Sequence, residues 1–258
     1  MALFTDGVPS TVDDLAALDS QLLNVAHVEA IDVTQKLTLA QIDLGLELTT
    51  LLTANSYNGQ WFWVTPRPNL GSVVVTPPLK QWHAYRALEM VYSDAYYSQL
   101  NDRYGGKRDQ FHRMAKQAYD KLRETGLGIV TAPVPVAAPP SAVAAPCGAG
   151  GNLPDGTYFV AMTWVNGVGE EGAASEATAV TTANSTFLAQ AGDTPRTATG
   201  WNVYAGTEPS NLFLQSAAAV EAGVSWVQPG ALNTAGRQPG TGQAWNYLRP
   251  IPRVMQRG

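Results

Sequence analysis

Apolar residues recur at helical spacing through the first part of the chain. Between residues 10 and 26 they follow a Ser10–Asp13 pair spaced as a capping box, and between residues 34 and 54 they form one face of a second segment. Asn55 to Gly59 are residues typical of a helix end. The spacing therefore predicts two amphipathic helices at the start of the chain.

Two longer helices are predicted between residues 76 and 125. Thr76 is a suitable N-cap, and Pro77 takes the first helical position, where its missing N–H costs nothing. The first helix is rich in aromatic residues, is expected to run to about Tyr104, and would span ~40 Å. The second helix covers residues 107–125, with Gly126 just past its end.

Residues 60–76 lack the helical period. Two aromatic and β-branched runs, Trp61 to Val64 and Val73 to Val75, flank a stretch of turn residues, which predicts a β-hairpin arm. Neighbouring side chains on a strand point to opposite faces, so Trp61 and Trp63 would share one face and Phe62 the other. Either both faces are covered inside the subunit, or one contacts a partner.

The period changes to two after residue 151. Apolar residues alternate with smaller ones from Thr157 to Val165, and Asn166-Gly167 is a strong hairpin signal. Further strands are expected at residues 175–182, 199–205, 211–216 and 223–228. Short strands separated by turn residues favour an immunoglobulin-like β-sandwich over residues 152–244.

The predicted fold class is therefore multidomain α + β. An N-terminal α-helical bundle occupies residues 1–130 and carries the arm at 60–76. A proline- and glycine-rich linker follows at 131–151. The β-sandwich covers 152–244, and a basic, aromatic tail covers 245–258.

Charge is scarce and unevenly placed. Charged residues make up 14% of the chain against a typical ~25%, which suits a subunit covered by neighbours. The net charge is −5, which argues against a general nucleic-acid binder. Residues 1–76 hold eight acids and two bases, whereas residues 77–130 hold six acids and nine bases. Contacts between copies could use such opposed blocks.

The expected compartment is a reducing cytoplasm. The single cysteine, Cys147, allows no disulfide within the chain. The first residues carry aspartates where a secretion signal would carry bases, and no apolar run of about 18 residues suggests a membrane span.

No catalytic, cofactor-binding or metal-binding residue is predicted. Gly167 to Gly172 matches G-x-G-x-x-G, but the segment lies between expected strands rather than before a helix, and its two glutamates would repel phosphate. His27, His83 and His112 have no metal-ligand spacing. Cys147 lies among linker glycines, so a catalytic thiol there is improbable.

The candidate functional residues are partner contacts on the arm and the tail. Arg249, Arg253 and Arg257 could meet DNA or dock on an acidic neighbour. The full set combines large apolar side chains with these bases: Trp61, Phe62, Trp63, Trp245, Tyr247, Leu248, Arg249, Ile251, Arg253 and Arg257.

Two segments resemble known phage proteins. Residues 79–89 and 96–104 resemble the long helix of tailed-bacteriophage head–tail adaptor proteins. Residues 199–206, which contain Gly-Trp-Asn-Val-Tyr, resemble a strand recurrent in immunoglobulin- or fibronectin-like domains of phage structural proteins. The β domain departs from a minimal adaptor.

The adaptor resemblance implies a non-enzymatic virion protein that joins the portal to the tail and helps retain packaged DNA. It implies a homo-oligomeric ring of about twelve copies, assembled in the host cytoplasm and located at the neck of the virion. The implied partners are the portal, tail or stopper proteins, possible capsid contacts and DNA passing through the ring, with no cofactor and no membrane.

An alternative function is a surface-exposed carbohydrate-binding or adhesive virion protein. Exposed tryptophans on the β domain would support it, and the candidates are Trp164, Trp201 and Trp226. Their burial decides between the two functions. A hydrolase of unrecognised type is a third hypothesis, and no motif in the chain supports it.

Overall fold

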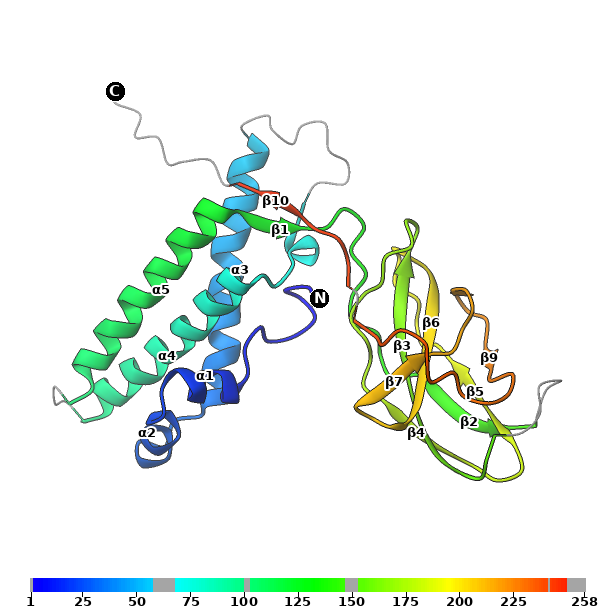
Figure 1. The fold of residues 1–258 in the computed structure, drawn as a ribbon. Helices are drawn as coiled ribbons and strands as arrows, with labels where there is room; N and C mark the ends of the chain where they lie inside the picture. Colours follow the sequence, from blue (N-terminus) through cyan, green and yellow to red (C-terminus); the bar gives the residue numbers. More distant parts are fainter. Residues whose placement is uncertain (1, 58–67, 100–102, 147–152, 241, 250–258) are drawn as a thin grey trace. The chain divides into compact units, whose positions relative to one another are not determined.

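The computed structural model describes residues 2–57, 68–99, 103–146, 153–240 and 242–249 (Figure 1). The chain divides into two compact units. The helical unit comprises Gly7–Thr131 and Trp245–Gly258, and the β unit comprises Met1–Asp6 and Ala132–Ala244. Helices therefore precede antiparallel strands along the chain, which confirms the mixed α + β class.

The first predicted helix is two helices, α1 (Val12–Leu18) and α2 (Leu22–Val28). The capping box of α1 is Thr11 with Asp14, one residue later than predicted. Ser10 instead donates its hydroxyl hydrogen to the backbone carbonyl of Lys80. Asp19 separates the two helices, because its backbone is extended and its carboxylate accepts the amide of Gln21.

Three long helices follow, α3 (Val33–Tyr57), α4 (Pro77–Gln99) and α5 (Gly105–Thr125). The hydroxyl of Thr76 makes no hydrogen bond within the described residues, so the predicted side-chain cap of α4 is wrong. Helix α4 ends at Gln99, before the expected end near Tyr104, and Gly105 and Gly106 form the start of α5. Gly126 ends α5 as predicted, with a positive φ of 99°.

The core of the helical unit runs along α4 (Figure 1), which lies beside both α3 and α5. Tyr92 is buried at its centre, stacks on Phe111 at 5.5 Å and donates a hydrogen bond of 2.6 Å to Asp19. All five helices contribute buried side chains, which include Leu15, Leu22, Val25, Leu37, Ala40, Ala84, Leu88, Val91, Tyr92 and Phe111.

A short antiparallel sheet closes the helical unit. Strand β1 (Leu127–Ile129) pairs with β10 (Asn246–Leu248), and Val73 forms a bridge with Ile129 on the other side of β1. Residues 245–248 are therefore part of the helical unit, and the prediction that 245–258 is wholly a tail is wrong. Of the predicted arm, residues 60–67 lie outside the described residues, and Leu70–Ser72 form a 3-10 turn, η1.

The described residues of the β unit form two antiparallel sheets. The first has the order β2 (Ser141–Ala145), β5 (Thr186–Gln190), β9 (Trp226–Val227). The second has the order β4 (Thr178–Thr182), β3 (Gly156–Asn166), β6 (Ala198–Glu208), β7 (Asn211–Leu214), and β8 (Val220–Glu221) also pairs with β6. Strands β3, β4, β6, β7 and β9 overlap the predicted strands.

The predicted linker at 131–151 is in large part folded. Strand β2 lies within it, and Val134 and Ala137 are buried in the core of the β unit. The proline-rich stretch is therefore not a linker along its whole length, because some of its prolines flank a strand of the first sheet.

One hydrophobic cluster takes side chains from both sheets. Tyr158, Val160, Met162 and Trp164 alternate along β3 and pack with Trp201 of β6, as the two-residue period predicted, and β5 adds Phe187 and Ala189. The G-x-G-x-x-G segment forms the turn after β3 and opens no helix. There the side-chain carbonyl of Asn166 accepts the amides of Val168 and Glu170.

Candidate interaction surface

The predicted contact residues fall into two groups. Trp61, Phe62, Trp63, Ile251, Arg253 and Arg257 lie outside the described residues. The other four lie together on and beside β10, where Leu248 is buried and Tyr247 and Arg249 are exposed. Trp245 packs close to Gly128 of β1, which leaves no room there for a larger residue.

A groove that the sequence analysis did not single out lies along α4. It consists of two adjoining cavities of about 440 and 300 Å³, one beside α3 and one beside α5. Asp43, Arg86 and Glu89 line both cavities. The groove therefore has a shared polar centre.

Residues at helical spacing line the groove from three helices. On each helix, residues three or four apart lie on the same side. The lining residues on α3 include Leu39, Asp43 and Leu46; those on α4 include Trp82, Arg86, Glu89 and Ser93; those on α5 are His112, Ala115, Lys116 and Tyr119. A surface of this kind suits an elongated partner such as a helix.

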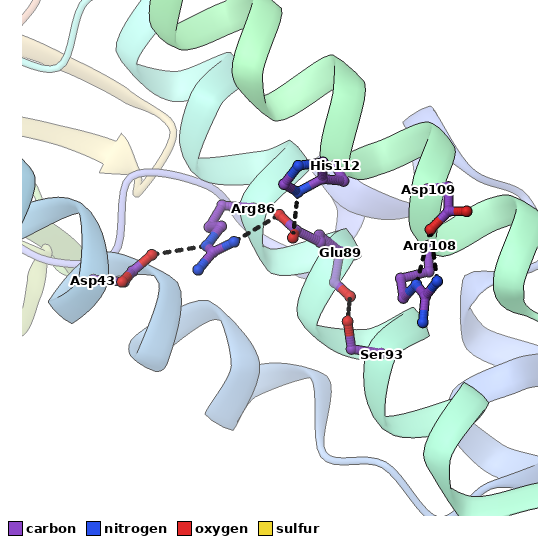
Figure 2. A network of polar contacts seen from close by, with 7 residues as sticks. All are labelled: Asp43, Arg86, Glu89, Ser93, Arg108, Asp109 and His112. Carbon is purple, nitrogen blue, oxygen red and sulfur yellow. Dashed lines mark hydrogen bonds and ion pairs between the residues drawn. The ribbon is translucent and has the colours of Figure 1, made fainter. Parts of the chain in front are cut away.

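The polar centre of the groove links the three helices (Figure 2). Arg86 donates to the carboxylates of Asp43 on α3 and of Glu89 on its own helix, at 2.7 and 2.8 Å. Glu89 also contacts His112 Nδ1 on α5 at 2.9 Å. Burial disfavours the charged form of Arg86, but Glu89 and Asp43 outweigh it and raise the pKa of the guanidinium. The network fixes α3 and α5 against α4.

An apolar stripe borders this groove on α3. Leu39, Ile42 and Leu46 follow one another at helical spacing and so share one side of α3, where they are 42%, 58% and 68% exposed. Single exposed apolar residues are normal on a protein surface, whereas larger exposed apolar patches often coincide with contact sites. The sequence does contain a signal for this stripe. Its residues form a second apolar face on α3, separate from the core face of Leu37, Ala40, Leu44 and Leu48.

The histidines take structural and surface positions. His83 is buried, and its Nε2 lies 3.0 Å from the carbonyl oxygen of Leu37. Burial lowers the pKa of His83. Within the described part of the chain, no cluster of three histidine, cysteine or acidic side chains could hold a metal ion. In the same ranges, no helix is both long and apolar enough to cross a membrane.

The β unit contains a buried carboxylate with several partners. The side chain of Glu171 is 1% exposed, accepts the hydroxyl of Tyr204 at 2.9 Å and pairs with Arg237 at 2.5 Å. Asn202 also donates to it. Burial, together with the charge of Glu171, raises the pKa of Tyr204. This cluster fixes the segment around Arg237 to the five-stranded sheet.

The tryptophans of the β unit offer little stacking surface. Trp164 and Trp201 are buried in the core, and Trp226 is half-buried against Phe187, with ring centroids 6.1 Å apart. Sugar binding usually needs an exposed aromatic face. The carbohydrate-binding alternative therefore receives no support from these three residues.

Comparison with models of known protein families finds no match for this chain. A comparison with curated proteins finds no match either.

Proposed function

We propose that this chain is a virion structural protein, a head–tail adaptor subunit that forms a ring between the portal and the tail and helps retain packaged DNA. The helical unit is the ring-forming bundle in this proposal, and the β unit is an immunoglobulin-like sandwich. Two antiparallel sheets that share one hydrophobic cluster support the second assignment.

The apolar stripe on α3 carries the proposal. Leu39, Ile42 and Leu46 are exposed at helical spacing on α3 and line a groove, while Leu37 and Ala40 of the same helix are buried in the core of the unit. Interfaces bury such stripes at their centre and leave charged residues at the rim. A ring subunit presents this kind of surface to its neighbours and needs no chemistry of its own.

The polar network of the groove supports a mechanical role. Arg86 ties α3 to α4, Glu89 contacts α5 through His112, and Asp19 ties α1 to α4 and α5 through Tyr92 and Lys107. Bonds of this kind hold the helices in one arrangement, so that identical copies present identical surfaces. A closed ring depends on that uniformity.

Mass measurement and electron microscopy test the proposal. The purified full chain, alone and mixed with the purified portal of the same phage, is examined by native mass spectrometry and negative-stain microscopy. We expect a ring of about twelve copies, alone or on the portal. A chain that stays monomeric in both conditions over the whole accessible concentration range overturns the proposal.

A further inference from the structure

We infer that the α3 stripe of one copy receives the outer face of α5 from a second copy. This inference rests on the proposed function and names the contact that would build the ring. The donor face is the solvent side of α5 at Arg113, Gln117 and Lys121, and the acceptor face is the stripe at Leu39, Ile42 and Leu46.

The acceptor face is apolar with an acidic rim. Glu47 is exposed beside Leu46 and forms no ion pair with the described residues. The carboxylates of Asp43 and Asp94 pair with Arg86 and Lys36 and keep 40% and 48% of their side-chain surface exposed at the groove. Residues 7–57 as a whole hold seven acids and one base. A partner that carries bases with long aliphatic stems fits this surface.

The donor face has that chemistry. Helix α5 holds six bases and three acids. Lys107 and Arg108 form ion pairs inside the unit, with Asp19 and Asp109, whereas Arg113 and Lys121 form none with the described residues and are exposed. Their aliphatic stems can cover apolar side chains while the charged ends reach a carboxylate.

The donor face is also free of the core of its own unit. Phe111, Ala115, Ala118 and Leu122 form the buried side of α5, and Arg113, Gln117 and Lys121 follow one another four residues apart on the opposite side. A neighbour can therefore contact these residues without displacing any part of the unit.

The charges disfavour pairing of two α3 faces. That arrangement would bring the Glu47 carboxylates of two copies together, and these lack the ion pairs that Asp43 and Asp94 make with Arg86 and Lys36. Like charges at a contact weaken it. Contact between two different faces is heterologous, and repeated contacts of this kind close into a ring when the rotation allows it. The acidic α3 of one subunit and the basic α5 of its neighbour thus carry opposite charges at the proposed contact.

Cross-linking tests which faces meet. In a Cys147→Ser background, Ile42→Cys and Gln117→Cys are combined in one full-length chain and treated with a short thiol cross-linker. We expect a ladder of dimers, trimers and larger species, because each copy links to two neighbours. Each single-cysteine variant should stay largely uncross-linked. Dimers from Ile42→Cys alone would show that α3 faces pair, which overturns the inference.

A matched pair of surface variants gives an independent readout. Ile42→Glu and Val28→Glu each place a charge at a residue that is 58% exposed, one on the stripe and one on α2. We expect Ile42→Glu to raise the concentration for half-assembly at least about tenfold, since a charge at an interface core is costly, and Val28→Glu to leave it unchanged. Circular dichroism confirms that both variants keep their helices.

The outcomes separate the two proposals. If the wild-type chain assembles and Ile42→Glu assembles equally well without a cross-linked ladder, the α3–α5 contact is wrong while the adaptor function stands. If the wild-type chain assembles neither alone nor on the portal, both proposals fail.

Discussion

At the scale of residues, the buried charges are the features that the sequence predicts least. Glu170 and Glu171 are adjacent, but Glu170 is half-buried whereas Glu171 is buried. That Glu171 is the buried one depends on Asn202, Tyr204 and Arg237, which are 31 to 66 residues away in the chain. Pairings over such distances leave no local signal.

The substitution Glu171→Gln tests the energy of this cluster. Gln keeps the shape but loses the charge that Arg237 pairs with, so we expect the β unit to lose about 1–3 kcal/mol of stability. Hydrogen exchange at the amides of β6 measures this loss. Glu176→Gln is the control, because Glu176 is exposed and its change should cost less than about 0.5 kcal/mol. Equal effects of both changes would contradict the assignment.

Asp19 gives the helical unit a predictable pH dependence. Burial alone would raise the pKa of Asp19, but hydrogen bonds from Tyr92 and Gln21 and the charge of Lys107 outweigh it and hold the pKa below its ordinary value. Because the folded-state pKa is depressed, the stabilisation is present above about pH 4 and is lost as the pH falls through the folded-state pKa.

Replacing Asp19 by Asn should therefore destabilise the unit at pH 7 and make less difference at pH ~3, because below the ordinary pKa of about 4 the unfolded chain takes up a proton and the contribution of the ionised carboxyl to stability begins to fall. Thermal unfolding followed by circular dichroism at both pH values measures this. Asp13→Asn serves as the control on the same helix, because Asp13 is exposed. A penalty for Asp19→Asn that is the same at both pH values would refute the explanation.

At the scale of elements, long periodic segments were predictable and short paired ones were not. The spacing of apolar residues indicates α3, α4 and α5, and the two-residue period indicates β3. Strand β2 was missed because it is rich in alanine, lies between prolines and pairs with β5, which is 45 residues further on. The acceptor stripe on α3 was also missed, since a sequence does not show which of two apolar faces is buried.

The glycine that follows α5 allows a direct test of how this helix ends. Gly126 has a φ of 99°, and a Cβ there would lie 2.8 Å from the carbonyl oxygen of Leu248. Gly126→Ala should destabilise the helical unit by more than about 1 kcal/mol, measured by urea unfolding followed by circular dichroism. Gly106→Ala, inside α5 with open space around it, should be neutral or stabilising by up to about 1 kcal/mol. The reverse order would be inconsistent with this local geometry.

At the scale of the whole molecule, the β unit interrupts the helical unit in sequence. Strands β1 and β10 are paired, and residues 132–244 connect them, so the chain leaves the helical unit after β1 and returns to it just before β10. The sequence suggested a linear series of domain, linker, domain and tail, because composition marks the proline-rich stretch but does not reveal a pairing across more than a hundred residues.

This connectivity divides the C-terminal residues into two parts with different roles, and two truncations separate them. Ending the chain after Arg249 keeps β10, so both units should stay folded, while attachment to the portal or tail weakens if the bases and apolar residues beyond it make the proposed contact. Ending the chain after Ala244 also removes Leu248, which is 3% exposed, and leaves β1 without its partner. Loss of one buried leucine costs about 2–3 kcal/mol, so the helical unit should become measurably less stable.

Hydrogen exchange at the β1 amides reports the stability of the helical unit in each truncated chain, and the yield of filled heads with joined tails reports attachment. We expect the chain that ends after Ala244 to show raised exchange at β1. The chain that ends after Arg249 should show a lower yield of joined particles, with exchange at β1 unchanged. If the shorter truncation joins heads to tails at the wild-type yield, residues 250–258 are dispensable. If both truncations leave β1 exchange unchanged, β10 contributes nothing to the stability of the helical unit, because a paired and buried strand cannot be removed without exposing the amides that it protects.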